Sequence, residues 1–171
     1  MSTIVNRSEG IEIQVGFAAY HWHAKGDSEL DLRQITQNFS VAPQIQPEDV
    51  ATLAEAGFRS IICNRPDGED YGQCDCCDIE AQARAAGMEF LMLPISSGVV
   101  TEEAAQGFRK ALDTMPGPIL AYCRSGTRCT MLWTIAQFDQ LPADEIVSKT
   151  GSAGYDMSGL VAQLKQMEQG T

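Results

Sequence analysis

A six-residue stretch in the second half of the chain combines one cysteine with two arginines and a glycine. It reads Cys-Arg-Ser-Gly-Thr-Arg at 123–128, and follows the short apolar run 118–122. Backbone N–H groups of such a loop can point inward, and the N-terminus of a following helix adds positive potential. The guanidinium groups of Arg124 and Arg128 can each donate paired hydrogen bonds to an anion. We therefore predict an anion-binding loop at this place.

Cys123 is the candidate nucleophile of the loop. The same positive field favours a thiolate over a thiol, so it lowers the pKa of the cysteine and makes the sulfur nucleophilic at neutral pH. Gly126 permits a backbone turn that a Cβ would hinder. The hydroxyls of Ser125 and Thr127 can donate hydrogen bonds to the loop or to a substrate. A purely structural cysteine between surface arginines is the less favoured alternative.

The elements that would position this loop alternate between strands and helices. Apolar runs predict strands, while proline or acidic residues at the start and glycine at the end predict helices. The predicted strands are 35–41, 60–63, 90–93 and 118–122, and the predicted helices are 47–57, 79–86, 101–115, 129–140, 143–150 and 157–169. Such alternation predicts a single α/β domain of three layers, α/β/α, with a mostly parallel sheet. Ligands of such sheets bind beyond the C-terminal ends of the strands, where residues 123–128 follow their strand.

Length and charge narrow the classes of function. A chain of 171 residues with ordinary globular composition predicts one domain. It carries 12 Lys and Arg against 23 Asp and Glu, a net charge of −11, which disfavours nucleic acid and anionic membranes as partners. No apolar run reaches the length of a transmembrane helix, and the polar start does not resemble a signal peptide. We therefore expect a cytoplasmic protein whose six cysteines are mostly reduced.

The loop resembles those of two enzyme groups. Protein tyrosine and dual-specificity phosphatases carry His-Cys-x5-Arg followed by Ser or Thr, whereas rhodanese sulfurtransferases carry a loop one residue shorter. Here the spacing is Cys-x4-Arg, and Tyr122 stands where phosphatases have histidine. The shorter loop makes a smaller cradle, which suits a persulfide better than a phosphoryl group.

The wider chain is identified as a member of the beta-lactamase hydrolase-like, phosphatase-like domain family, formerly domain of unknown function 442. The resemblance rests on ITQNFSVAPQIQPEDVATLAEAGFRSIICNRPDGE, MLPISSG, GPILAYCRSGTRCTMLW and AGYDMSGLVAQL. It implies a protein-tyrosine-phosphatase-like fold, with Cys123 as nucleophile and Arg128 as anion clamp. Some relatives are fused to a metallo-hydrolase of sulfide oxidation, which favours sulfur chemistry. We assign 34–169 to the catalytic domain and 1–33 to an N-terminal extension of uncertain fold.

One departure concerns the general acid. Dual-specificity phosphatases carry an aspartate about thirty residues before the cysteine, but the matching stretch 93–98 holds no carboxylate. Protonation of the leaving oxygen is worth about 10²–10⁴-fold in phosphoester cleavage, whereas sulfite leaves thiosulfate as an anion. A phosphatase would have to recruit Asp67, Glu69 or Asp70. In the same motif Arg65 is a candidate anion ligand, although Pro-Asp-Gly is also ordinary turn chemistry.

The favoured function is therefore sulfur transfer. The Cys123 thiolate would take sulfur from a sulfane donor as a persulfide, and a thiol or cyanide acceptor would remove it. The alternative is a phosphatase that works through a Cys123 phosphoenzyme, and a third reading is a non-enzymatic sulfur carrier or anion sensor. The expected partners are a small anionic substrate, either a sulfane sulfur donor or a phosphoester, and a thiol acceptor. We expect no cofactor and no metal, and no oligomeric state is predicted.

Four other features carry alternatives. Cys74, Cys76 and Cys77 could bind zinc with His21, His23 or Cys63, but their spacing favours reduced thiols on a surface loop. Cys129 could form a disulfide with an oxidised Cys123, but a core position is favoured. Trp133 is expected in the core. Alternating apolar residues in 11–17 predict a strand in the extension.

Overall fold

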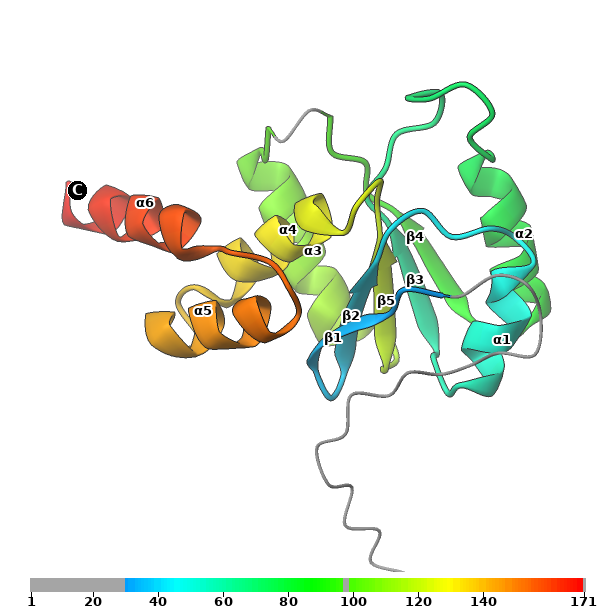
Figure 1. Cartoon of the computed structure of the whole chain (residues 1–171), viewed down its shortest axis with the longest axis horizontal. Coiled ribbons are helices and arrows are strands. Elements are labelled where there is room, and N and C mark those ends of the chain that lie inside the picture. Colours follow the sequence, from blue (N-terminus) through cyan, green and yellow to red (C-terminus); the bar gives the residue numbers. More distant parts are fainter. Residues whose placement is uncertain (1–29, 97–98, 171) are drawn as a thin grey trace, which may run out of the picture.

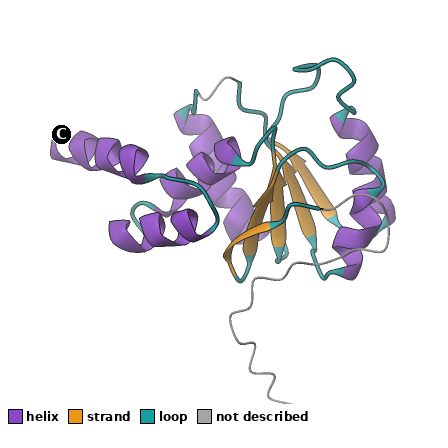
Figure 2. Cartoon of the chain, in the orientation of Figure 1, coloured by secondary structure: helices purple, strands orange, loops and turns teal. Residues whose placement is uncertain are grey.

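The computed structural model describes residues 30–96 and 99–170, which form a five-stranded sheet covered by helices on both faces (Figures 1 and 2). The strand predicted at 11–17, together with His21 and His23, lies outside the described residues. The strands are β1 (Arg33–Thr36), β2 (Phe39–Ala42), β3 (Ser60–Cys63), β4 (Glu89–Met92) and β5 (Ile119–Tyr122). The helices are α1 (Asp49–Glu55), α2 (Cys76–Ala85), α3 (Glu102–Thr114), α4 (Thr127–Gln137), α5 (Ala143–Ser152) and α6 (Ser158–Gln169).

The sheet has the order β1-β2-β5-β3-β4, and its last four strands run parallel. β1 runs antiparallel to β2 and pairs Arg33 with Val41. The prediction of one strand over 35–41 is therefore wrong. A tight turn divides that run into a hairpin, where the Asn38 N–H donates to Thr36 Oγ1 at 3.3 Å. β1 reads RQIT and has one apolar residue, Ile35, so hydrophobic periodicity does not reveal the turn.

The three predicted layers are confirmed. Successive residues of a strand point to opposite faces, and β5 shows this clearly. Ala121 packs toward α3, α4, α5 and α6, whereas Leu120 and Tyr122 pack toward α1 and α2. All four residues of β2, of β3 and of β5 are buried, as interior parallel strands require. α6 extends away from the sheet beyond α5 (Figure 1).

The helices follow the predicted rhythm with shifted ends. Thr101 caps α3, since its Oγ1 accepts from the Ala104 N–H at 3.2 Å. α2 begins at Cys76, three residues before the predicted start at 79. α4 begins at Thr127, so its first turn includes Arg128 and follows the Cys123 loop without a linker.

Candidate active site

The candidate site lies at the C-terminal edge of the parallel strands. Residues 123–126 join β5 to α4, and the segments after β3 and β4 leave the same edge of the sheet (Figure 1). The register explains this arrangement, because Tyr122 at the end of β5 pairs with Cys63 at the end of β3 and with Ala42 at the end of β2. The side chains that follow these strands therefore meet at one place.

Cys123 lies at the base of the loop, with no exposed surface. The backbone N–H of Gly126 donates to its Sγ at 3.1 Å. A side-chain hydrogen bond from Cys129 is the largest influence on the Cys123 pKa, and backbone N–H groups of Cys129, Ser125 and Arg128 add to it. Burial opposes them, yet together they lower the pKa of Cys123 to about 5. At neutral pH the sulfur is a thiolate.

Cys129 is fully buried in the core between the sheet and α4, as the favoured sequence interpretation expected. It also contacts Cys123, so the core position and a role beside the nucleophile are compatible. Burial and the neighbouring thiolate raise the pKa of Cys129 well above its usual range, which keeps it a protonated donor.

Arg128 is held by Glu69, from the loop that follows β3. Arg128 Nη1 donates to Glu69 Oε1 at 2.6 Å, and Nη2 donates to Oε2 at 2.8 Å. Nη1 also donates to the Ile95 carbonyl at 2.7 Å. The Arg128 contact is the largest reason why the pKa of Glu69 falls to about 2. The Arg128 guanidinium also interacts directly with Cys123, which helps to raise its own pKa.

Arg65 is a buried member of the same hydrogen-bond network, because it also donates to Glu69. Its guanidinium is only 4% exposed, and Nε, Nη1 and Nη2 donate to Glu69, Gln44 and Asp70 at 2.9, 2.9 and 2.5 Å. All three nitrogens therefore have protein acceptors. The role of Arg65 as an anion ligand stays a prediction; its nitrogens are bonded to Glu69, Gln44 and Asp70.

The carboxylates of this loop take different places. Asp67 Oδ1 accepts from the Cys76 N–H at 2.8 Å, at the start of α2. This bond places the Asp67 carboxylate at the start of α2. Asp70 pairs with Arg124 Nε at 3.3 Å. Glu69 is the carboxylate in contact with Arg128, but its low pKa keeps it ionised.

The outer residues of the loop are exposed. The Arg124 side chain is 67% exposed, so it can swing toward a ligand. Ser125 Oγ and Thr127 Oγ1 are hydrogen-bonded to each other at 3.0 Å, and the Thr127 N–H also approaches Ser125 Oγ at 3.4 Å. These two hydroxyls stabilise the turn into α4.

Three residues that contact the loop were not predicted to do so from the sequence, and these are Glu69, Ile95 and Tyr155. Tyr155, between α5 and α6, donates from its hydroxyl to the Ser125 carbonyl at 2.9 Å. Tyr155 lies in the stretch AGYDMSGLVAQL, one of those that carry the family resemblance. Its place in that stretch was the one sequence signal that could have pointed to it. Nothing in the local pattern indicates a contact across 30 residues.

The three clustered cysteines do not share a surface loop, because α2 begins at Cys76. Cys76 is buried and Cys77 is exposed on the first turn of the helix, while Cys74 is half-buried. Burial raises the pKa of Cys63, Cys74 and Cys76, so these are thiols. Across residues 30–96 and 99–170, no three side chains of His, Cys, Asp or Glu are grouped to hold a metal ion.

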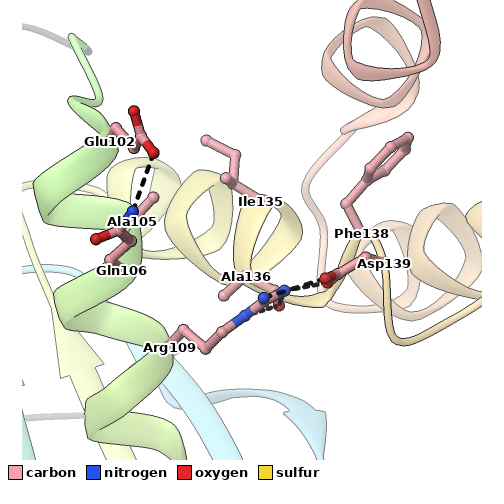
Figure 3. A pocket seen from close by; sticks show the side chains of 8 residues that line it. All are labelled: Glu102, Ala105, Gln106, Arg109, Ile135, Ala136, Phe138 and Asp139. Carbon is pink, nitrogen blue, oxygen red and sulfur yellow. Dashed lines mark hydrogen bonds and ion pairs between the residues drawn. The ribbon is translucent and has the colours of Figure 1, made fainter. Parts of the chain in front are cut away.

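A separate hollow lies between α3 and α4 (Figure 3). The Arg109 guanidinium spans it to Asp139 and to the Ala136 carbonyl, while Gln106 pairs with Glu102 along α3. Trp133, predicted as core, is buried nearby in α4 and stacks on Phe39 with ring centroids 6.3 Å apart. No residue of the Cys123 loop lines this hollow, so it is distinct from the candidate site.

Comparison with known proteins decides the family. A sequence profile described as "Beta-lactamase hydrolase-like protein, phosphatase-like domain" matches residues 31–140. The chain belongs to this family. Among its relatives, a beta-lactamase hydrolase-like protein of Xylella fastidiosa (strain Temecula1) is 31% identical over 139 residues, which are 80% of this chain. A protein of the same name from Agrobacterium fabrum is 34% identical over 61% of this chain and 24% of its own. The chain spans about a third of the Xylella relative, 32% of its length.

Solved structures confirm the fold. A Neisseria meningitidis protein provisionally described as a phosphatase is 30% identical, with a TM-score of 0.70, and the match covers 80% of this chain and 97% of that one. The protein Tk-PTP is 14% identical with a TM-score of 0.61, covering 81% and 97% of the two chains, and so shares the fold alone. The family and the tyrosine-phosphatase-like fold predicted from the sequence are therefore both confirmed.

Among the described residues, none of the helices is long and apolar enough to cross a bilayer.

Proposed function

We propose that this domain is a cysteine-dependent phosphatase. The observation that carries the proposal is a thiolate with a pKa of about 5, held by loop N–H groups beside the Arg128 guanidinium in a tyrosine-phosphatase-like fold. Sulfur transfer, the function favoured from the short loop, the missing general acid and the sulfide-oxidation fusions, gains no support from the relatives. They favour the alternative, since the family and its structural neighbours are phosphatase-like.

The proposed reaction has two steps. The Cys123 thiolate attacks the phosphorus, so that an S–P bond forms while the ester P–O bond breaks and the leaving oxygen takes the electron pair. Water then attacks the thiophosphate, the S–P bond breaks, and dihydrogen phosphate leaves while the thiolate returns. Loop N–H groups and Arg128 stabilise the negative charge of the equatorial oxygens in both steps.

The site indicates aryl phosphates as the substrate class. Glu69 is ionised, and Asp67 is committed to the start of α2. A phenolate leaves without prior protonation more readily than an alkoxide, so an aryl ester depends less on a general acid. We assign Glu69 and Arg65 to holding Arg128 in place rather than to proton transfer.

A paired assay on the wild-type protein tests the proposal. One arm measures phosphate release from p-nitrophenyl phosphate, and the other measures thiocyanate from thiosulfate and cyanide. We expect phosphate release with the larger kcat/KM, unchanged in the matched control Cys77→Ser, whose thiol is exposed on α2. Thiocyanate formation alone would overturn the proposal and restore sulfur transfer. Phosphate binding without turnover in either arm would instead support the anion sensor.

Replacing Cys129 should change the pH dependence of this activity. The thiolate is the reactive form, so kcat/KM falls as pH decreases through the Cys123 pKa of about 5. Cys129→Ala removes the largest stabilising hydrogen bond and should move this acidic limb upward by about one pH unit. Cys129→Ser keeps a donor and should leave the limb near its wild-type position. Equal pH profiles for the alanine and serine variants would contradict this assignment.

A further inference from the structure

Tyr155 links the C-terminal helices to the Cys123 loop. It lies between α5 and α6, is 7% exposed, and belongs to a part of the chain beyond the residues 31–140 that match the family profile. We propose that Tyr155 is a positioning residue that holds the Gly126 N–H on the Cys123 sulfur. The expected effect on catalysis rests on the proposed function, whereas the effect on the Cys123 pKa can be measured without turnover.

One peptide group connects the tyrosine to the nucleophile. The Tyr155 hydroxyl donates to the Ser125 carbonyl at 2.9 Å, and the N–H of the same Ser125–Gly126 peptide donates to Cys123 Sγ at 3.1 Å. In a planar trans peptide, the C=O and N–H bonds point in opposite directions. A bond that fixes the carbonyl on one side therefore fixes the N–H on the other. Ser125 is exposed, so without Tyr155 water could solvate its carbonyl in other orientations.

The close packing of the tyrosine on the loop supports this role. Gly126 has φ +87°, a left-handed conformation that side chains rarely adopt. A Cβ at this position would lie 2.1 Å from Tyr155 Oη and 3.0 Å from Cζ. The glycine thus permits both the loop conformation and the approach of the tyrosine ring.

The tyrosine is itself held in place as a neutral donor. The Arg33 guanidinium of β1 lies 5.2 Å from the centroid of its ring, and the Tyr155 N–H donates to the Thr150 carbonyl at 2.9 Å. Burial raises the pKa of Tyr155 to about 12, although the Arg33 charge opposes this shift. The hydroxyl therefore keeps its proton across the pH range in which Cys123 titrates.

The test is a titration of the Cys123 thiolate by its ultraviolet absorbance, from about pH 4 to 9, in wild type and in Tyr155→Phe. Each protein is referenced to its own Cys123→Ser partner, so that other thiols and tyrosines cancel. We expect the pKa of Cys123 to rise by about one unit in Tyr155→Phe, which keeps the ring and loses only the hydroxyl. Tyr71→Phe, at a fully exposed tyrosine, should titrate like wild type.

The outcomes separate the two proposals. A low wild-type pKa that stays within about 0.3 unit in Tyr155→Phe overturns the positioning role and leaves the proposed function intact. An ordinary wild-type pKa, near about 8.5, removes the thiolate on which the proposed function depends. If the pKa rises as expected, kcat/KM near pH 5 should fall by about threefold to tenfold, with a smaller loss near pH 8, where both proteins hold the thiolate.

Discussion

Cys123→Ser is expected to lower kcat/KM for p-nitrophenyl phosphate by about 10⁴- to 10⁶-fold. The loop lowers the pKa of a thiol to about 5, but a serine hydroxyl starts from a far higher pKa and stays protonated in the same field. The change removes the nucleophile and leaves the anion-binding groups of the loop. Phosphate binding, measured by calorimetry, should therefore persist while turnover is lost.

The intermediate makes this prediction specific. Trypsin is expected to cleave after Lys110 and Arg124, and the resulting peptide 111–124 contains Cys123 and no other cysteine. Acid quenching of the wild-type reaction followed by mass spectrometry should show a phosphate on this peptide, and the serine variant should show none. Residual activity above about one tenth of wild type in Cys123→Ser would exclude Cys123 as the nucleophile. The Cys77→Ser protein controls for the loss of an exposed thiol.

Short-range spacing in the sequence brings part of the candidate site together. Cys123, Gly126 and Arg128 lie within six residues, so the turn between β5 and α4 brings them together whatever the rest of the chain does. The strand alternation likewise predicted the buried run 60–63, since each interior strand of a parallel sheet is apolar on both faces.

The partners of the loop could not be predicted in the same way. Glu69 reaches Arg128 across 59 residues and Tyr155 reaches Ser125 across 30, and each depends on how separate segments meet at the sheet edge. The hydrogen-bond partners of Arg65 could not be predicted from the sequence either. An arginine beside an anion site is a reasonable ligand by composition, and its pairing with Glu69 and Asp70 becomes visible only in the fold. Polar partners of this kind follow from tertiary packing rather than from spacing.

Arg128→Lys is the second large expected effect, a loss of about 10²–10³-fold in kcat/KM for p-nitrophenyl phosphate. The guanidinium donates two parallel bonds to Glu69 and also interacts with Cys123. A lysine ammonium is a point charge without this planar fork, so it cannot bind Glu69 through two nitrogens and a phosphoryl oxygen in the same geometry. Because the equatorial oxygens bind most strongly in the transition state, we expect most of the loss in kcat.

The matched control is Arg84→Lys, which makes the same substitution in an exposed pair with Glu80 on α2. It should keep wild-type kcat and KM. Arg128→Lys retains the backbone N–H that helps to hold the thiolate, so the Cys123 titration should move far less than the rate. The Cys123 pKa in Arg128→Lys could instead rise far enough to explain the whole loss of rate. That result would mean that Arg128 acts on the nucleophile rather than on the phosphoryl group. A loss below about fivefold would contradict the anion-clamp role altogether, because a bidentate donor to a developing charge contributes more than that.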